Sequence, residues 1–286
     1  MIVLHRFLAI IGTLWFAFIT FETSADASPS EQQCGNLNES QVKNGQRITE
    51  LDEHPWIARI EFTDSQGDRE HLCIGALINT RHVVTAAHCL DNADRDVSAV
   101  VLGDWDSSNN ITERDCNPQG LCAPPPQRIE LKSLAMHPDY TIHKVDNDIA
   151  VIKLARNAEI SEYVQPICLP TAEEVSTGTA DTALQVSGFV RPNRRNITKR
   201  IKMPFEKVRT EECQKKDRDN RIANSNICGS TEFNPMSGSA LIEAHGEPRR
   251  FHLVGVAAAG FNSEPSLHLH TNVRLHLNWI LQNSKM

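Results

Sequence analysis

Short apolar segments separated by polar turns run along most of the chain. These segments lie at Ile57–Phe62, Leu72–Ile78, His82–Thr85, Ala99–Leu102, Ile149–Leu154, Ala183–Ser187, Ile201–Val208 and His252–Ala259. Clusters of Asp, Asn and Gly separate them, which is typical of strands joined by turns. Helical spacing occurs only near the end, from Val273 to about Gln282, with Leu277, Ile280 and Leu281 on one face. The pattern predicts an all-β barrel or sandwich that ends in one helix.

The first residues have the pattern of a secretory signal. His5 and Arg6 precede an apolar run from Phe7 to Phe21, and Ala25-Asp26-Ala27 supplies the small residues of a cleavage site. We therefore expect a signal peptide over residues 1–27 and a secreted, extracellular protein. A membrane anchor is the alternative, although the run is short for a membrane span.

Composition fits one large extracellular domain or two coupled halves. A formal net charge of -7 argues against nucleic acid as a partner. Eight cysteines, an even number, fit a disulfide framework in a secreted chain. Glycosylation sequons begin at Asn38, Asn110 and Asn196. We expect a disulfide-bonded glycoprotein without a nucleic-acid or membrane partner.

Two motifs in the first half resemble the chymotrypsin-like (trypsin-type, S1) serine proteases. Leu72–Ile78 is followed by Val84–Cys89, which contains the Thr-Ala-Ala-His-Cys signature of that family. The resemblance extends from about Val42 to Lys285. It implies two antiparallel six-stranded β-barrels with a C-terminal α-helix, in a domain over residues 42–286. It also implies that His88 is the general base.

The other two members of a catalytic triad follow in the family's order. Asp148 lies in Asp146–Leu154, which resembles the family's Asn-Asp-Ile-Ala-Leu strand, and the resemblance implies that it orients the histidine. An ordinary strand-capping aspartate is the alternative. Ser237 lies in Asn234–Leu241, where the family has Gly-Asp-Ser-Gly-Gly-Pro-Leu. Proteolysis would then use His88, Asp148 and Ser237.

An insertion between Gly103 and Pro126 resembles the extra disulfide loop of insect clip-domain immune proteases, which act in cascades leading to Toll signalling or melanisation. Their upstream clip domain has no counterpart here, because Cys34 alone cannot form one. The subfamily has a calcium loop, so Asp104, Glu113 and Asp115 are candidate ligands. A solvated acidic loop is the alternative, and we expect no other cofactor or metal.

The resemblance also implies a disulfide framework. Residues 28–41 form a polar stretch that reads either as a disordered tail or as a pro-segment tethered through Cys34. The implied pairs are Cys34–Cys168, Cys73–Cys89, Cys116–Cys122 and Cys213–Cys228. The family's bridge beside the nucleophile has no counterpart, since Phe233 stands at one of its ends.

The nucleophile loop departs from the family at two positions needed for catalysis. Pro235 stands where a backbone N–H should face the oxyanion, and proline has none. Met236 replaces the aspartate that pairs with the new amino terminus after activating cleavage. The cleavage site is altered too, because Gln41–Gly45 stands where the family has Arg-Ile-Val-Gly-Gly. These departures predict a site with impaired catalysis.

The substrate-binding positions differ as well. Ala258-Ala259-Gly260 replaces the family's Ser-Trp-Gly, and Thr231 falls near the specificity position, so no preference for Arg or Lys is expected. His268 and His270 alternate along one strand. They suggest zinc, but no carboxylate or cysteine joins them, so we interpret this as a surface strand.

Three functions are compatible with these features. The first is a secreted, non-catalytic serine protease homologue that regulates an extracellular protease cascade, with other proteases or their protein substrates as partners. The second is an active serine endopeptidase. The third, a structural or carbohydrate-binding module, is supported only by the sequons.

Overall fold

The computed structural model describes residues 34–91, 94–142, 144–171, 183–191, 197–217, 222–223, 225–261 and 263–285. The expected signal peptide over residues 1–27 and the sequon residue Asn196 lie outside the described residues. Within the described ranges, no helix combines the length and apolar character needed to cross a membrane.

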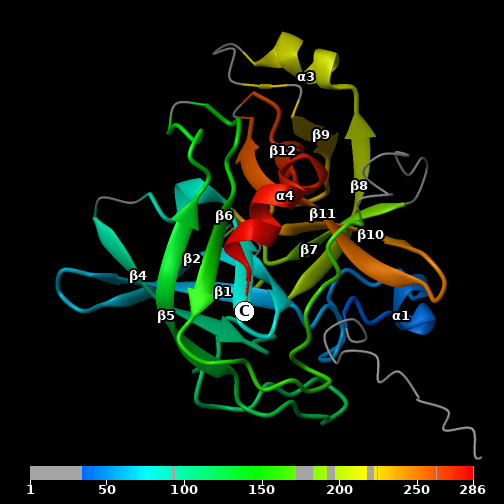
Figure 1. Ribbon diagram of the computed structural model, residues 1–286. Coiled ribbons are helices and arrows are strands. Elements are labelled where there is room, and N and C mark those ends of the chain that lie inside the picture. The colour runs from blue at the N-terminus through cyan, green and yellow to red at the C-terminus, as the bar shows by residue number, and fades with distance from the viewer. Residues whose placement is uncertain are drawn as a thin grey trace, which may run out of the picture. The chain divides into compact units, whose positions relative to one another are not determined.

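Six antiparallel strands close the first barrel (Figure 1). They are β1 (Ile57–Asp64), β2 (Arg69–Asn79), β3 (His82–Thr85), β4 (Arg95–Leu102), β5 (Gln127–Met136) and β6 (Ala150–Leu154). The order around the barrel is β1-β2-β3-β6-β5-β4. The short 3₁₀ helix η1 (Ala87–Cys89) follows β3 directly. The interior is filled by apolar side chains, with Trp56, Ile60 and Ile74 fully buried.

The second barrel has the same construction. Its strands are β7 (Leu184–Gly188), β8 (Ile201–Val208), β9 (Asn226–Ser230), β10 (Ala240–His245), β11 (Arg250–Gly260) and β12 (Leu267–Asn272), in the order β10-β11-β12-β9-β8-β7. Helix α4 (Val273–Asn283) continues from β12, and the Asn272 side chain caps it by accepting from the Arg274 N–H at 3.0 Å. The expected fold class of two six-stranded barrels with a C-terminal helix is confirmed.

Several elements were missing from the sequence prediction. The sequence pattern did not predict strand β5. Only Ile129 among its residues is buried, so the strand contains no apolar run. Helices α1 (Glu39–Lys43) and α3 (Thr210–Lys216) contradict the expectation that helical structure occurs only at the end. They are short, and their sole buried residue is Cys213 in α3, so neither has an apolar stripe.

The eight cysteines form four disulfides, Cys34–Cys168, Cys73–Cys89, Cys116–Cys122 and Cys213–Cys228. These are the pairs that the family resemblance implied. The first joins residues 134 positions apart and fixes the beginning of the described chain to the segment between the barrels. Such frameworks belong to oxidising compartments.

The amino-terminal segment is anchored on the second barrel by Lys202 of β8. Its ammonium group lies 2.6 Å from a carboxylate oxygen of Glu53, and both side chains are buried. The same group donates to Asn44 Oδ1 at 2.9 Å and to the Gln41 carbonyl. Because one buried cation makes all three contacts, residues 41–53 are held against β8.

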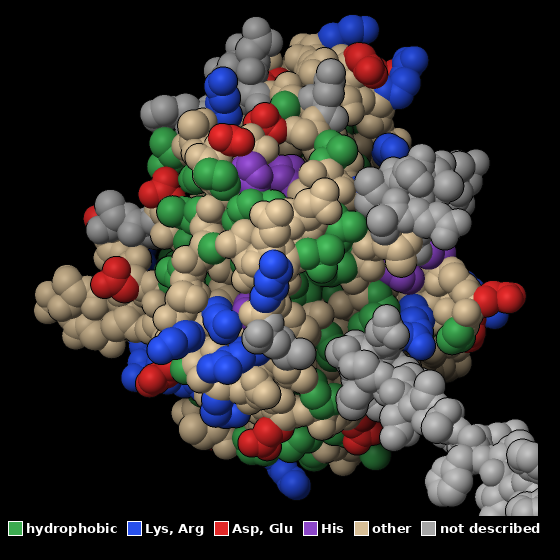
Figure 2. Space-filling model, in the orientation of Figure 1, with side chains coloured by type: hydrophobic (Ala, Val, Ile, Leu, Met, Phe, Trp, Pro, Cys, Tyr) green, Lys and Arg blue, Asp and Glu red, His purple; other side chains and the backbone are tan. Residues whose placement is uncertain are grey.

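The face shown in Figure 2 carries both signs of charge. Lys and Arg side chains gather over the first barrel, beside the C-terminal end of the chain, and Asp and Glu side chains are scattered around the rim. This face therefore has a basic region, although the formal net charge of the chain is -7.

Candidate active site

The histidine and aspartate expected in the site are in direct contact. His88 Nδ1 lies 2.6 Å from Asp148 Oδ2, and the His88 backbone N–H donates to Asp148 Oδ1 at 2.8 Å. Asp148 is buried, and the Thr271 hydroxyl donates to its backbone carbonyl at 2.8 Å. A carboxylate acceptor on Nδ1 fixes the tautomer that leaves Nε2 free to take a proton.

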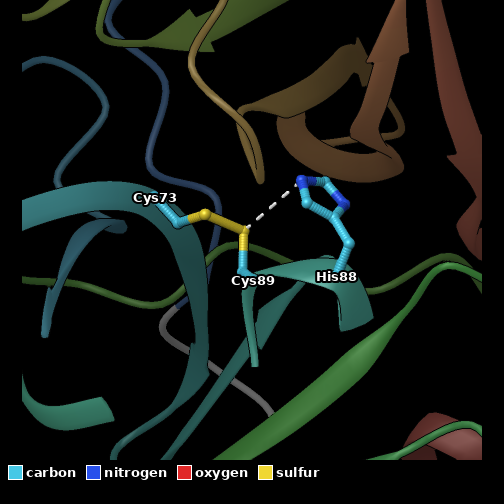
Figure 3. Close-up of side chains that lie close together, drawn as sticks. All are labelled: Cys73, His88 and Cys89. Carbon is cyan, nitrogen blue, oxygen red and sulfur yellow. Dashed lines mark hydrogen bonds between the residues drawn. A yellow bond between two sulfur atoms is a disulfide. The ribbon is translucent and has the colours of Figure 1, made fainter. Parts of the chain in front are cut away.

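The other ring nitrogen of His88 faces a disulfide. Nε2 lies 3.9 Å from Cys89 Sγ (Figure 3). Cys73, His88 and Cys89 are close enough together to resemble metal ligands. The two sulfur atoms are bonded to each other, so neither is the thiolate that binds a metal. These three residues are therefore a histidine beside a disulfide, and they do not form a metal site.

Ser237 is engaged by an arginine instead of by the histidine. Arg191 Nη2 donates to Ser237 Oγ at 2.9 Å. Within the described chain, His88 makes no hydrogen bond to Ser237. The described residues thus contain a histidine–aspartate pair and a serine hydroxyl that no hydrogen bond joins in one relay.

Backbone pairing with the nucleophile loop places Arg191. Val190 and Pro235 form an isolated antiparallel bridge. On either side of it, the Arg191 N–H donates to the Asn234 carbonyl at 3.0 Å and the Met236 N–H donates to the Phe189 carbonyl at 2.9 Å. These bonds hold residues 189–191 along the nucleophile loop, which brings the guanidinium to Ser237.

The loop itself is rigidly seated on β2. The Ile74 N–H donates to the Ser237 carbonyl at 2.9 Å. Gly238 has φ +84°, and a Cβ at this position would lie 1.8 Å from the Ile74 carbonyl oxygen. Only glycine fits there. The serine is therefore held in position, while Pro235 supplies no N–H for an oxyanion.

Met236 takes up an interior position. Its side chain is buried in the main apolar core, where it offers no carboxylate to a new amino terminus. Residues 41–44 are bound at Lys202 through the contacts described above. The geometry thus has an anchor for the amino-terminal segment that does not involve Met236.

A narrow pocket opens beside Ser237. It is lined by Arg191, Asn234, Pro235, Ser237, Ala257, Ala258, Ala259, Gly260 and His268. Thr231, expected near the specificity position, is not among the described lining residues, and its hydroxyl donates to the Phe233 carbonyl at 2.6 Å.

The interpretation of His268 and His270 as part of a surface strand is wrong. Both side chains are buried, because β12 lies between β11 and β9 in the closed barrel. The His270 ring packs edge-on against Phe205, with centroids 5.0 Å apart. Burial lowers the pKa of His268 to about 4 and that of His270 to about 3. Neither belongs to a metal-like cluster within the described ranges.

The acidic loop does not fit a calcium ion. Asp104 is buried in an ion pair with Arg59. Asp115 accepts from the backbone N–H groups of Trp105 and Asp106 at 2.7 and 3.0 Å. Glu113 is exposed. Since protein donors already use both buried carboxylates, these residues do not form an open set of oxygen ligands.

Two of the sequons are accessible. Asn38 and Asn110 are exposed, and each side-chain oxygen accepts from the hydroxyl of its own sequon, Ser40 or Thr112. Both positions therefore have room for a glycan.

Sequence reasoning missed Arg191 entirely, and it weighed His268 as a zinc ligand before placing it on a surface strand. Arg191 and Ser237 are 46 positions apart, and a β-bridge between Val190 and Pro235 brings them together. His268 is opposite Gly260 in the β11–β12 register, and Gly260 lines the pocket. The available signal for His268 was the alternation of the two histidines along β12, together with the replaced segment Ala258–Gly260.

Comparisons with known proteins agree with the fold. The family model described as Trypsin matches residues 43–280. Serine protease ea of Drosophila melanogaster is 36% identical over 201 residues, covering 67% of this chain and 51% of that protein, so the chain spans about half of its length. Phenoloxidase-activating factor 3 of Holotrichia diomphalia is 32% identical over 275 residues, covering 91% and 77%. The crystal structure of Drosophila Grass, a clip serine protease of the Toll pathway, matches with a TM-score of 0.75 at 26% identity, covering 87% and 74%.

Proposed function

The chain belongs to the trypsin family, and we propose that it is an extracellular, non-catalytic serine protease homologue that regulates a protease cascade. Its partners are other proteases of the cascade or their protein substrates. The names of two relatives refer to phenoloxidase activation and to the Toll pathway, which supports an insect immune setting. Four disulfides support an extracellular location.

The observation that carries this proposal is Pro235 in the nucleophile loop. An oxyanion hole needs N–H donors where negative charge develops, and loss of one donor typically lowers the rate about 10²–10³-fold. Pro235 lacks the donor covalently, so no movement of the loop restores it. The hydrogen bond from Arg191 adds a second obstacle, because it engages a lone pair of the oxygen that would attack a substrate. A nucleophilic serine also needs its hydroxyl paired with a base, and in the described chain His88 makes no such bond.

The rival function is an active serine endopeptidase acting through His88, Asp148 and Ser237. The 2.6 Å contact between His88 and Asp148 favours it, because this pair is the acid–base half of a triad. The pair is also compatible with a purely structural role, since it links η1 to the segment before β6.

A comparison of wild type with Ser237→Ala separates the two functions. The purified secreted protein is added to a clip-type protease and its zymogen substrate, and product release is measured. The non-catalytic function predicts that both forms change product release equally and that neither hydrolyses a peptide library. An effect that disappears with Ser237→Ala, together with peptide hydrolysis by the wild type, would establish the enzyme.

A further inference from the structure

We propose that the pocket beside Ser237 is a carboxylate-binding site that recognises an acidic group on a protein partner. The partner group is the side chain of Asp or Glu, or a free C-terminal carboxylate. That the ligand belongs to a protein partner rests on the proposed function. The chemistry that the retained site would recognise is a carboxylate.

The charge of the pocket is set by Arg191. Arg191 is exposed and lines the pocket, and within the described ranges its side chain makes no ion pair with a carboxylate. Its side-chain hydrogen bond goes to the neutral hydroxyl of Ser237. A guanidinium binds a carboxylate more strongly than a hydroxyl, because both partners are charged and two parallel hydrogen bonds can form. An incoming carboxylate would therefore replace Ser237 Oγ as the acceptor.

His268 supplies a second polar group. Its side chain is buried, and in the described part of the chain its Nε2 has no hydrogen-bond partner. Buried polar atoms are rarely left unpaired, so this nitrogen needs an explanation. The pKa of the ring is lowered to about 4, first by burial and then by Arg191, so it is neutral at pH 7. A neutral imidazole donates one hydrogen bond without repelling Arg191, and a bound anion would be stabilised by both groups.

The remaining wall selects for small ligands. Ala257, Ala258 and Ala259 carry only methyl groups, and Gly260 carries none. A Cβ at Gly260 would lie 3.4 Å from His268 Nδ1 and 3.9 Å from Asn234 Oδ1, so the glycine leaves the space between them open. The described lining contains no acidic residue, which excludes the basic side chains that many proteases of this family accept.

Three short peptides distinguish the ligand sources. The first is a blocked pentapeptide of alanines with one central Asp, the second has Asn in its place, and the third is a trialanine with a free C-terminal carboxylate. Binding to the full secreted protein is followed by NMR shift changes, and hydrolysis is monitored in the same samples. We expect the Asp peptide to bind about tenfold more tightly than the Asn peptide, the ratio for one charge-assisted hydrogen bond. Preference for the trialanine over the Asp peptide would assign the site to a chain terminus.

Variants locate the binding. Arg191→Gln should abolish the preference for Asp over Asn, and His268→Leu should reduce it. Arg209→Gln is the matched control, because it removes an exposed arginine that lies outside the pocket and is paired with Glu212. Equal binding of the Asp and Asn peptides, no saturable binding of any acidic peptide, or an unchanged preference in Arg191→Gln would overturn the proposal. Hydrolysis of the peptides would instead contradict the proposed function, while the preference for the Asp over the Asn peptide could still be measured.

Discussion

Pro235 removes a donor from the nucleophile loop, and Arg191 donates a hydrogen bond to the oxygen that would act as the nucleophile. The two changes have different chemistry. The first is covalent and permanent, whereas the second is a hydrogen bond of 2.9 Å that a side-chain rotation breaks. The proposed loss of catalysis therefore depends first on Pro235, and Arg191 gives the retained hydroxyl a different partner.

Restoring the loop alone should not restore proteolysis. In Pro235→Gly with Met236→Asp, the donor returns and a carboxylate is supplied, but residues 41–44 remain bound at Lys202 and no new amino terminus is freed. We expect kcat/KM on peptide substrates to stay at the level of the same double variant carrying Ser237→Ala. Hydrolysis that depends on Ser237 in the double variant would refute the role assigned to the amino-terminal segment.

At the scale of elements, the sequence pattern located most strands of the first barrel but missed β9 and β10 of the second, although both are largely buried. Strands β3 and β8 were predicted with the same bounds as observed, because apolar or alternating residues end at polar turns. Strand β5 was missed because only Ile129 among its residues is buried, and α3 because a disulfide holds it rather than an apolar stripe. The triad positions came from local motifs. Arg191 could not be found from a local motif, since its contact with Ser237 depends on long-range strand pairing.

The histidines of β12 make the second barrel sensitive to acid. The pKa of His270 is about 3 in the folded chain, against 6.5 for the free side chain, so between these values the unfolded chain binds a proton that the folded chain does not. The free energy of unfolding therefore falls as the pH falls. For His270 alone the loss between about pH 7 and about pH 5 is about 2 kcal/mol.

His270→Leu tests this linkage. Urea unfolding of the oxidised protein at the two pH values should show a pH dependence smaller by about 2 kcal/mol than that of the wild type, whatever the absolute stability of the variant. An equal pH dependence in the two proteins would show that folding does not lower the pKa of His270.

At the scale of the whole molecule, Lys202 ties the beginning of the domain to the second barrel. Lys202→Met leaves the buried Glu53 carboxylate without its cation, and the expected cost is about 3–5 kcal/mol. Limited proteolysis between Gln41 and Glu53 should become faster. Adding Glu53→Gln to the variant should recover most of the stability, because no buried charge is then left unpaired. A Lys202→Met protein as stable as the wild type would contradict the anchor.

The central claim, that Ser237 is a retained hydroxyl without catalytic activation, is tested most directly by a fluorophosphonate probe. Such probes form a covalent adduct with activated serine nucleophiles, so labelling reports activation without requiring a known substrate. The folded protein is incubated with the probe beside Ser237→Ala and an active clip-type protease, and adducts are mapped by mass spectrometry. We predict no adduct at Ser237 above the Ser237→Ala background. Stoichiometric labelling of Ser237 would contradict the account.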